Sequence, residues 1–253
     1  MDSKLNLTMR YFLGVHKLAP KLAIAGDMGW EPPEVRRKGE MVRLWNRLIA
    51  MPDSRLTKQI FLWDISTGNA WSNKIECVFE ETGLQHIFRN KLKCNIAHIK
   101  SILFDTYKKK WADDIWLKPK LRTYCLLKSG YHPELYVTLN LTRIQRSICA
   151  QYRCGILPLA LETGRFHSIP EDERKCQLCD LFEVENETHF LFHCPLYHNH
   201  RQKLFGKIPD CRDLLSFSDE SNLSFLFNNH VFPLATFLSD AYQTRKSTLF
   251  SVR

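Results

Sequence analysis

The 253-residue sequence lacks any long apolar run. Its longest one, 156–161, is short and contains a proline, whereas a membrane-spanning helix needs about 20 consecutive apolar residues. The first ten residues carry charges and asparagine instead of an apolar stretch, so they do not have the pattern of a signal peptide. We therefore expect an intracellular protein of the nucleus or cytoplasm, with no membrane partner.

The sequence also has no low-complexity linker and no internal repeat. Hydrophobic residues make up 44% and charged residues 25%, close to the averages of globular proteins, which argues against disordered and fibrous classes. Nine cysteines are an odd number and come without a secretion signal. A disulfide framework is therefore not expected, and metal binding or simple burial is the better interpretation.

Residues with period-two alternation are scarce, since 135–139 is the one mild strand candidate. Apolar residues instead recur at helical spacing. The expected helices are 33–49, a second helix after a cap at Asp53 or Ser54, one continuous helix through 88–103, and helices over 141–152 and 234–250. The predicted fold class is mostly α: a helical, bundle-like basic region, a small zinc-stapled module and C-terminal helices.

Aromatic usage changes along the chain and guides the domain prediction. All six Trp lie at or before position 116, whereas eleven of the sixteen Phe lie at or after position 166. We expect a helical region over 1–155, a zinc-binding module over 156–205 and a helical tail over 206–253.

The excess positive charge lies in the central third of the chain. Residues 86–168 contain 15 basic and five acidic residues, a net +10, while the rest contains 21 basic and 22 acidic residues. Such a concentration favours a polyanion, RNA or DNA, over a small-molecule substrate, although a solvated helical face would have the same composition. The expected nucleic-acid contacts are Lys108, Lys109, Lys110, Lys118, Lys120, Arg122, Arg143, Arg146, Arg153 and Arg165.

One group of residues has the spacing of a metal site. Cys176 and Cys179 are three apart, and after nine residues His189 begins a segment that ends with Cys194. Two thiolates on a tight turn, closed by a His and a Cys, suit tetrahedral Zn²⁺. We favour Cys194 as the fourth ligand. His193 stays open as an alternative, with His198 and His200 further behind, and the bland alternative is a set of ordinary buried thiols. Four protein ligands would make the site structural.

Asp113 and Asp114 have the pairing found in a polymerase palm, where two aspartates hold Mg²⁺ on a hairpin. The lysines that precede this pair and Pro119 that follows it are not typical of a buried strand. We therefore expect a solvated helix end and no catalytic role.

Several segments carry a resemblance to a known family. They include Cys154-Gly-Ile-Leu-Pro, Ile169-Pro, Glu173-Arg-Lys-Cys176 and Glu187-Thr-His-Phe-Leu-Phe-His-Cys-Pro-Leu-Tyr197, with looser matches upstream at Arg10-Tyr-Phe-Leu-Gly, Gly26-Asp-Met-Gly-Trp30, Asp53-Ser-Arg-Leu-Thr-Lys58 and Pro119-Lys-Leu-Arg-Thr-Tyr124. Together they resemble the C-terminal region of non-LTR (jockey- or LINE-like) retrotransposon reverse transcriptases, including the reverse transcriptase zinc-binding region.

The resemblance implies that Cys176, Cys179, His189 and Cys194 bind zinc and that the region contacts nucleic acid. Palm, fingers and endonuclease are not recognisable in the sequence, so we expect no enzyme activity. The expected function is a zinc-stabilised, nucleic-acid-binding remnant or fragment of such a polymerase. The alternative is a helical protein-interaction module in which zinc is purely structural.

The charge pattern also predicts where nucleic acid binds. The segment 176–194 contains no Lys or Arg and carries Asp180, Glu183, Glu185 and Glu187. We therefore expect phosphates to contact the central basic third and the zinc module to act as a brace.

Overall fold

The computed structural model describes residues 3–209 and 218–251. The chain is mostly α, with 71% helix and no strand in the described ranges, as the sequence predicts. Cys211 and part of the predicted tail lie outside those residues. In the described part of the chain, no helix is both long and apolar enough to cross a membrane.

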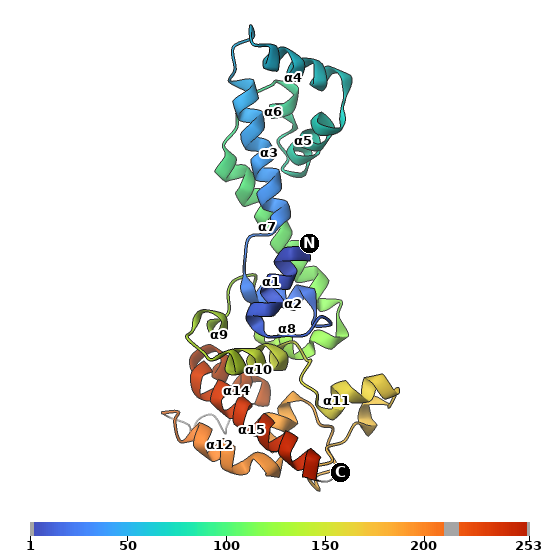
Figure 1. Ribbon diagram of the computed structural model, residues 1–253, viewed down its shortest axis with the longest axis vertical. Coiled ribbons are helices and arrows are strands. Elements are labelled where there is room, and N and C mark those ends of the chain that lie inside the picture. Colours follow the sequence, from blue (N-terminus) through green and yellow to red (C-terminus); the bar gives the residue numbers. More distant parts are fainter. Residues whose placement is uncertain (1–2, 210–217, 252–253) are drawn as a thin grey trace. The chain divides into compact units, whose positions relative to one another are not determined.

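Contacts divide the chain into two units (Figure 1). Unit 1 contains residues 31–111, and unit 2 contains residues 3–30 and 112–251. The boundaries predicted near 155 and 205 both lie inside unit 2. The reason is that the N-terminal segment packs with the C-terminal half of the chain, a pairing that local sequence patterns do not record.

Unit 1 is built around a buried tryptophan. Trp45 has ring contacts with Phe61, Phe79 and Phe88, and its indole N–H donates to the carbonyl of Leu92 at 2.9 Å. The helices of this unit are α3 (Pro33–Ile49), α4 (Leu56–Thr67), α5 (Ala70–Glu81), α6 (Gln85–Arg89) and α7 (Ile96–Trp116), whose last residues belong to unit 2.

The sequence patterns predict α3 and the existence of α4 correctly. They are wrong about the cap of α4 and about the continuity of the helix that follows. Helix α4 begins after Arg55 with no side-chain cap, so neither Asp53 nor Ser54 caps it. The expected helix over 88–103 is interrupted between α6 and α7. The Asn46 side chain accepts from the Cys94 N–H at 3.0 Å and donates to the Cys94 carbonyl at 2.7 Å. These bonds hold the linker outside helical geometry, which local periodicity cannot reveal.

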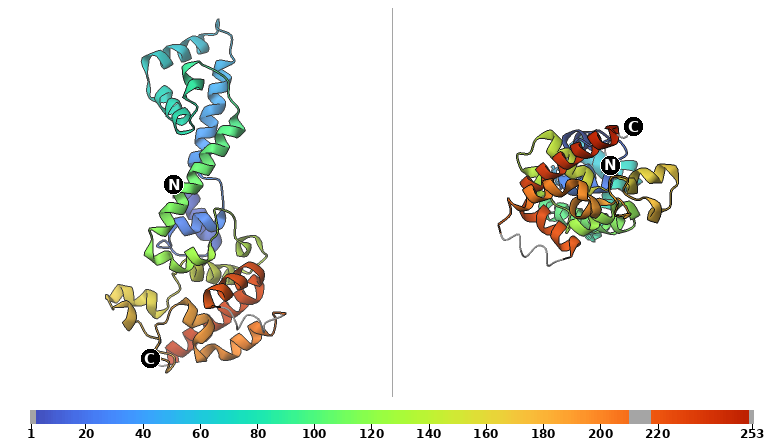
Figure 2. Two further views of the ribbon diagram at one scale, coloured as in Figure 1. Left: turned by 180° about the vertical axis from the view of Figure 1, so that it is seen from behind. Right: turned by 90° about the horizontal axis from the view of Figure 1, so that it is seen from below.

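Unit 2 is organised around α10 (Arg143–Arg153). This helix contacts α1 (Ser3–Leu13), α8 (Arg122–Leu127), α9 (Leu135–Thr138) and α15 (Val231–Ser251). Thr142 and Gln145 form a capping box at its start. Helices α14 and α15 lie side by side (Figures 1 and 2). The other helices of unit 2 are α2 (Lys21–Met28), α11 (Ala160–Thr163), α12 (His198–Phe205) and α14 (Asp219–Asn229).

The strand candidate at 135–139 is wrong, since α9 occupies it. The Leu139 N–H donates to the Leu135 carbonyl at 2.9 Å, a bond across four residues that makes this segment a helical turn. The predicted helices over 141–152 and 234–250 are confirmed as α10 and α15.

A buried ion network links α2 to α10. The Arg153 guanidinium donates two hydrogen bonds to the Asp27 carboxylate at 3.1 Å and lies 3.2 Å from Glu134. Lys128 pairs with Glu134, and the Tyr136 hydroxyl donates to Asp27 at 2.7 Å. Burial disfavours the charge on Arg153, but the two carboxylates outweigh it and raise the pKa of its guanidinium. Two cations and two anions therefore balance one another inside the unit.

Replacing Asp27 by Asn should destabilise unit 2 by about 3–5 kcal/mol, because it leaves the buried cations Arg153 and Lys128 with one carboxylate of the network instead of two. Urea unfolding followed by circular dichroism measures the loss. Asp172→Asn, at an exposed position, is the matched control and should change the unfolding free energy little. Equal stability of the two variants would contradict the assigned role of the network.

Candidate metal centre and nucleic-acid interface

The first two cysteines lie on a loop closed by a short backbone pairing. The arms 174–176 and 183–185 are joined by an isolated antiparallel bridge, and the Cys176 N–H donates to the Glu183 carbonyl at 2.9 Å. Cys176 ends the first arm and Cys179 lies in the connecting loop, where the Leu178 N–H points at the Cys176 sulfur at 3.4 Å. The pairing holds both sulfurs on one side of the loop.

The other two ligands come from a π-helical turn, His189–His193. On an α-helix, residues five apart point about 140° away from each other. Here the Cys194 N–H donates to the His189 carbonyl at 2.8 Å, a bond across five residues that widens the turn. His189 and Cys194 can therefore face the same point. Asn186 starts the turn by accepting from the His189 N–H at 2.7 Å.

Four side chains thus converge: Cys176, Cys179, His189 and Cys194. Their ligand atoms all lie within 4.8 Å of one another. Cys176, His189 and Cys194 are buried, and Cys179 is partly exposed. The Cys179 sulfur lies 3.5 Å from His189 Nε2. This cluster, the Cys₃His cluster below, can hold a metal ion.

The electrostatics of the thiols fit a bound cation. A hydrogen bond from Cys176 lowers the pKa of Cys194, and the same bond raises the pKa of Cys176 to about 12. Thiols this close share protons because several thiolates cannot ionise together without a compensating positive charge. A metal ion supplies that charge and displaces the protons.

Glu183 orients the histidine. His189 Nδ1 lies 2.9 Å from the Glu183 carboxylate, which leaves Nε2 facing the sulfurs. The hydrogen bond from His189 lowers the pKa of Glu183. A carboxylate that holds the second nitrogen of a ligating histidine is the usual outer partner of such sites. The sequence motif did not single out Glu183 for this role.

His193, the open alternative for the fourth ligand, faces elsewhere. Its Nδ1 lies 3.4 Å from Glu183 and its Nε2 lies 2.8 Å from Asp219 of α14. The remaining candidates are outside the cluster too, since His200 contacts Thr244 at 2.9 Å and His198 is exposed. The geometry therefore favours Cys194.

Two acidic residues fasten the cluster to the rest of unit 2. Glu185 is buried and forms a two-pronged ion pair with Arg245 of α15 at 2.9 and 2.7 Å. Glu187 is buried and accepts from Arg122, while its carbonyl accepts from the Tyr152 hydroxyl at 2.8 Å. Two of the four acidic residues in segment 176–194 are therefore paired with arginines inside the protein.

The predicted nucleic-acid contacts require one clear correction. Arg153 has only 1% of its surface exposed and is paired with Asp27 and Glu134. A phosphate cannot reach it. The sequence pattern of α10 shows one apolar stripe. It does not reveal that Arg153, which lies off that stripe, is buried as well.

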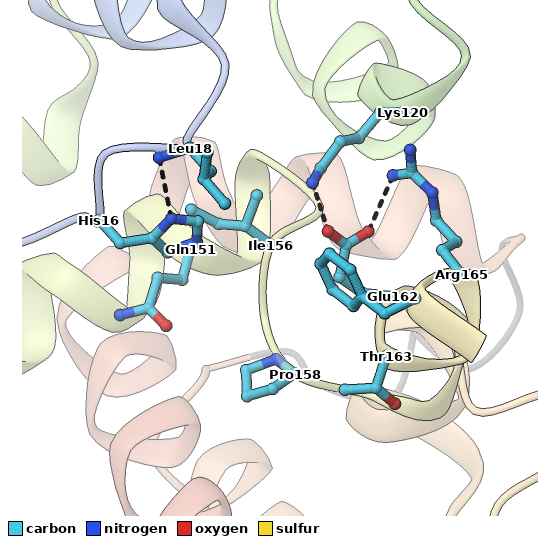
Figure 3. A pocket seen from close by; sticks show the side chains of 10 residues that line it. His16, Leu18, Lys120, Gln151, Ile156, Pro158, Glu162, Thr163 and Arg165 are labelled. Atoms are coloured by element: carbon cyan, nitrogen blue, oxygen red, sulfur yellow. Dashed lines mark hydrogen bonds and ion pairs between the residues drawn. The ribbon is translucent and has the colours of Figure 1, made fainter.

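Three further predicted residues are tied to carboxylates. Lys120 and Arg165 both bind Glu162, on the wall of a hollow that Figure 3 shows from close by. Arg122 binds Glu187 at 2.9 Å. These ion pairs reduce the positive charge that each residue offers to a phosphate.

The remaining six are divided between the units. Lys108, Lys109 and Lys110 belong to unit 1, where Lys108 pairs with Asp105 at 3.1 Å. Lys118 and Arg143 are exposed in unit 2. Arg146 is half-buried over the Phe12 ring at 4.4 Å.

Arg143 lines a hollow of about 770 Å³ on unit 2, between α1, α10 and α15. Exposed cations from distant parts of the sequence, Lys17 and Lys246, line it too, while Arg10 is buried and bonded to the carbonyls of His16 and Ala19. No described residue that lines this basic hollow carries a carboxylate. Sequence reasoning missed Lys17 and Lys246 because both lie outside the charged central third.

The chain matches no protein-family model, no curated protein and no solved structure. The resemblance to retrotransposon reverse transcriptases therefore stays a prediction from the sequence motifs.

Replacing Cys194 by Ser should abolish stoichiometric metal binding, whereas His193→Gln should retain it, because only the first removes a ligand atom from the cluster. Native mass spectrometry of both purified variants measures metal per chain. Metal loss in His193→Gln with retention in Cys194→Ser would reverse the assignment.

Removing the Glu183 carboxylate should weaken metal affinity by about 10–100-fold, because His189 loses the partner that orients it. Competition with a chelator measures the change in Glu183→Ala. Glu171→Ala removes an exposed acid outside the loop and should leave the affinity unchanged. The same affinity in both variants would refute the orienting role.

Proposed function

We propose that this protein binds nucleic acid and that a structural zinc ion stabilises its fold. The observation that carries the proposal is the basic hollow: Lys17, Arg143 and Lys246 converge there with no carboxylate among the described lining residues. Uncompensated cations around a recess attract phosphates, and their counterions are released on binding.

Zinc is the metal that best suits the Cys₃His cluster. Three thiolates and one imidazole are a common ligand set of tetrahedral structural zinc sites. Bond lengths in such sites place a sulfur and a nitrogen ligand about 3.5 Å apart, and the Cys179 sulfur lies 3.5 Å from His189 Nε2. With four protein ligands the ion has no open position for a substrate or a catalytic water, so its role is to hold the loop and the π-helical turn together.

The proposal includes descent from the C-terminal region of a retrotransposon reverse transcriptase, without its catalysis. The Cys₃His cluster supports the motif match, since it brings together the four residues that the resemblance implies. Asp113 and Asp114 lie near the end of α7. A helix cannot present them as the hairpin pair of a palm, which supports a non-catalytic role.

One observation favours the alternative of a protein-interaction module. Leu56, Ile60 and Trp63 recur at helical spacing along α4 in unit 1, and each is more than half exposed. An apolar stripe of this kind suits a protein partner. This alternative predicts no salt-dependent binding to nucleic acid.

Replacing Arg143 and Lys246 together by Ala should weaken binding to RNA or DNA and reduce the salt slope by about 2, one unit for each lost phosphate contact. Fluorescence anisotropy over a salt series measures both quantities. The control is Lys203→Ala with Lys207→Ala, which removes two exposed charges from α12 and the turn after it. Identical slopes in the two double variants would remove the hollow from the interface, and no binding by the unmodified protein would favour the interaction module.

A further inference from the structure

We infer that the basic hollow accepts an unpaired, single-stranded segment of nucleic acid, with bases against its exposed apolar side chains and phosphates against its cations. This inference rests on the proposed function and names its substrate class. It depends on the kinds of side chain that line the hollow and not on the number of charges alone.

Exposed apolar side chains line the hollow beside its cations. Leu7, Tyr11 and Ile144 are 69%, 71% and 62% exposed and come from two helices, α1 and α10. Single exposed apolar residues are common, but three that line one recess mark a contact surface. Phosphate binding alone does not explain these apolar side chains, because phosphates bind cations and hydrogen-bond donors.

Cations and rings are also paired within the hollow. The Arg143 guanidinium lies 4.9 Å from the centre of the Tyr11 ring, and the Lys246 ammonium lies 4.6 Å from the centre of the Tyr242 ring. Each pair places a positive charge beside a planar, partly apolar face. A nucleotide has the matching halves, one phosphate and one planar base.

Duplexes do not offer that combination. In a double helix the base faces are stacked on their neighbours, and only groove edges and phosphates are accessible. Unpaired bases can stack on tyrosine rings or on an arginine plane. Because each base has a planar face, this mode of binding tolerates many sequences, and the hollow should show little sequence preference.

The test compares one mixed sequence of about 12 nucleotides as single-stranded RNA, single-stranded DNA and duplex DNA. The full protein should bind the single strands more tightly than the duplex. Tyr11→Ala should weaken single-strand binding by about 5- to 100-fold and leave duplex binding unchanged. Tyr11→Phe should bind like the unmodified protein, since it keeps the ring. Phe232→Ala, at another exposed aromatic position, should have no effect. The RNA and DNA arms establish which single strand is preferred.

The possible failures are distinguishable. Duplex binding as tight as single-strand binding, with no effect of Tyr11→Ala, would overturn the inference and leave the proposed function standing. Absence of binding to every oligonucleotide would overturn the proposed function itself. Binding to anionic phosphatidylserine vesicles in place of oligonucleotides would reassign the hollow to a lipid surface.

Discussion

The buried pair of Asp27 and Arg153 is the constraint on which unit 2 depends. Without its partner, neither charge could remain in the interior, because removing an ion from water without compensation costs several kcal/mol. Arg153 lies at the end of α10 and Asp27 lies in α2. The pair therefore fixes the N-terminal helices against the helix that organises the C-terminal half, although the two residues are far apart in the sequence.

Helix α10 connects this network to both candidate sites. Its first turn carries Arg143, which lines the basic hollow. Near its end, the Tyr152 hydroxyl donates to the carbonyl of Glu187, just before the π-helical turn that carries His189. Helix α15 has the same double role, because Arg245 binds Glu185 while the adjacent Lys246 lines the hollow. The same two helices thus hold the Cys₃His cluster in place and shape the hollow.

This arrangement reconciles the acidic segment 176–194 with the nucleic-acid binding that we propose. Glu185 and Glu187 form ion pairs with Arg245 and Arg122 within the fold. Glu183 orients His189. These three acidic residues therefore orient a residue of the Cys₃His cluster or fasten the cluster to the rest of unit 2. The positive charge that remains accessible in the hollow comes from α10, α15 and the turn after α1.

The sequence by itself determined the helical class, through apolar residues at helical spacing. It also named Cys176, Cys179 and His189 as candidate ligands, with ordinary burial as the alternative. Spacing alone favoured Cys194 and left His193, four residues after His189, as an alternative. An α-helix would turn position 194 away from His189. The π-helical turn, made by a bond across five residues, decided for Cys194. Tertiary structure likewise buried Arg153 against Asp27 and brought Lys17 and Lys246 beside Arg143. Local patterns report which face of a helix is apolar, whereas the pairing of distant charges depends on how the helices pack.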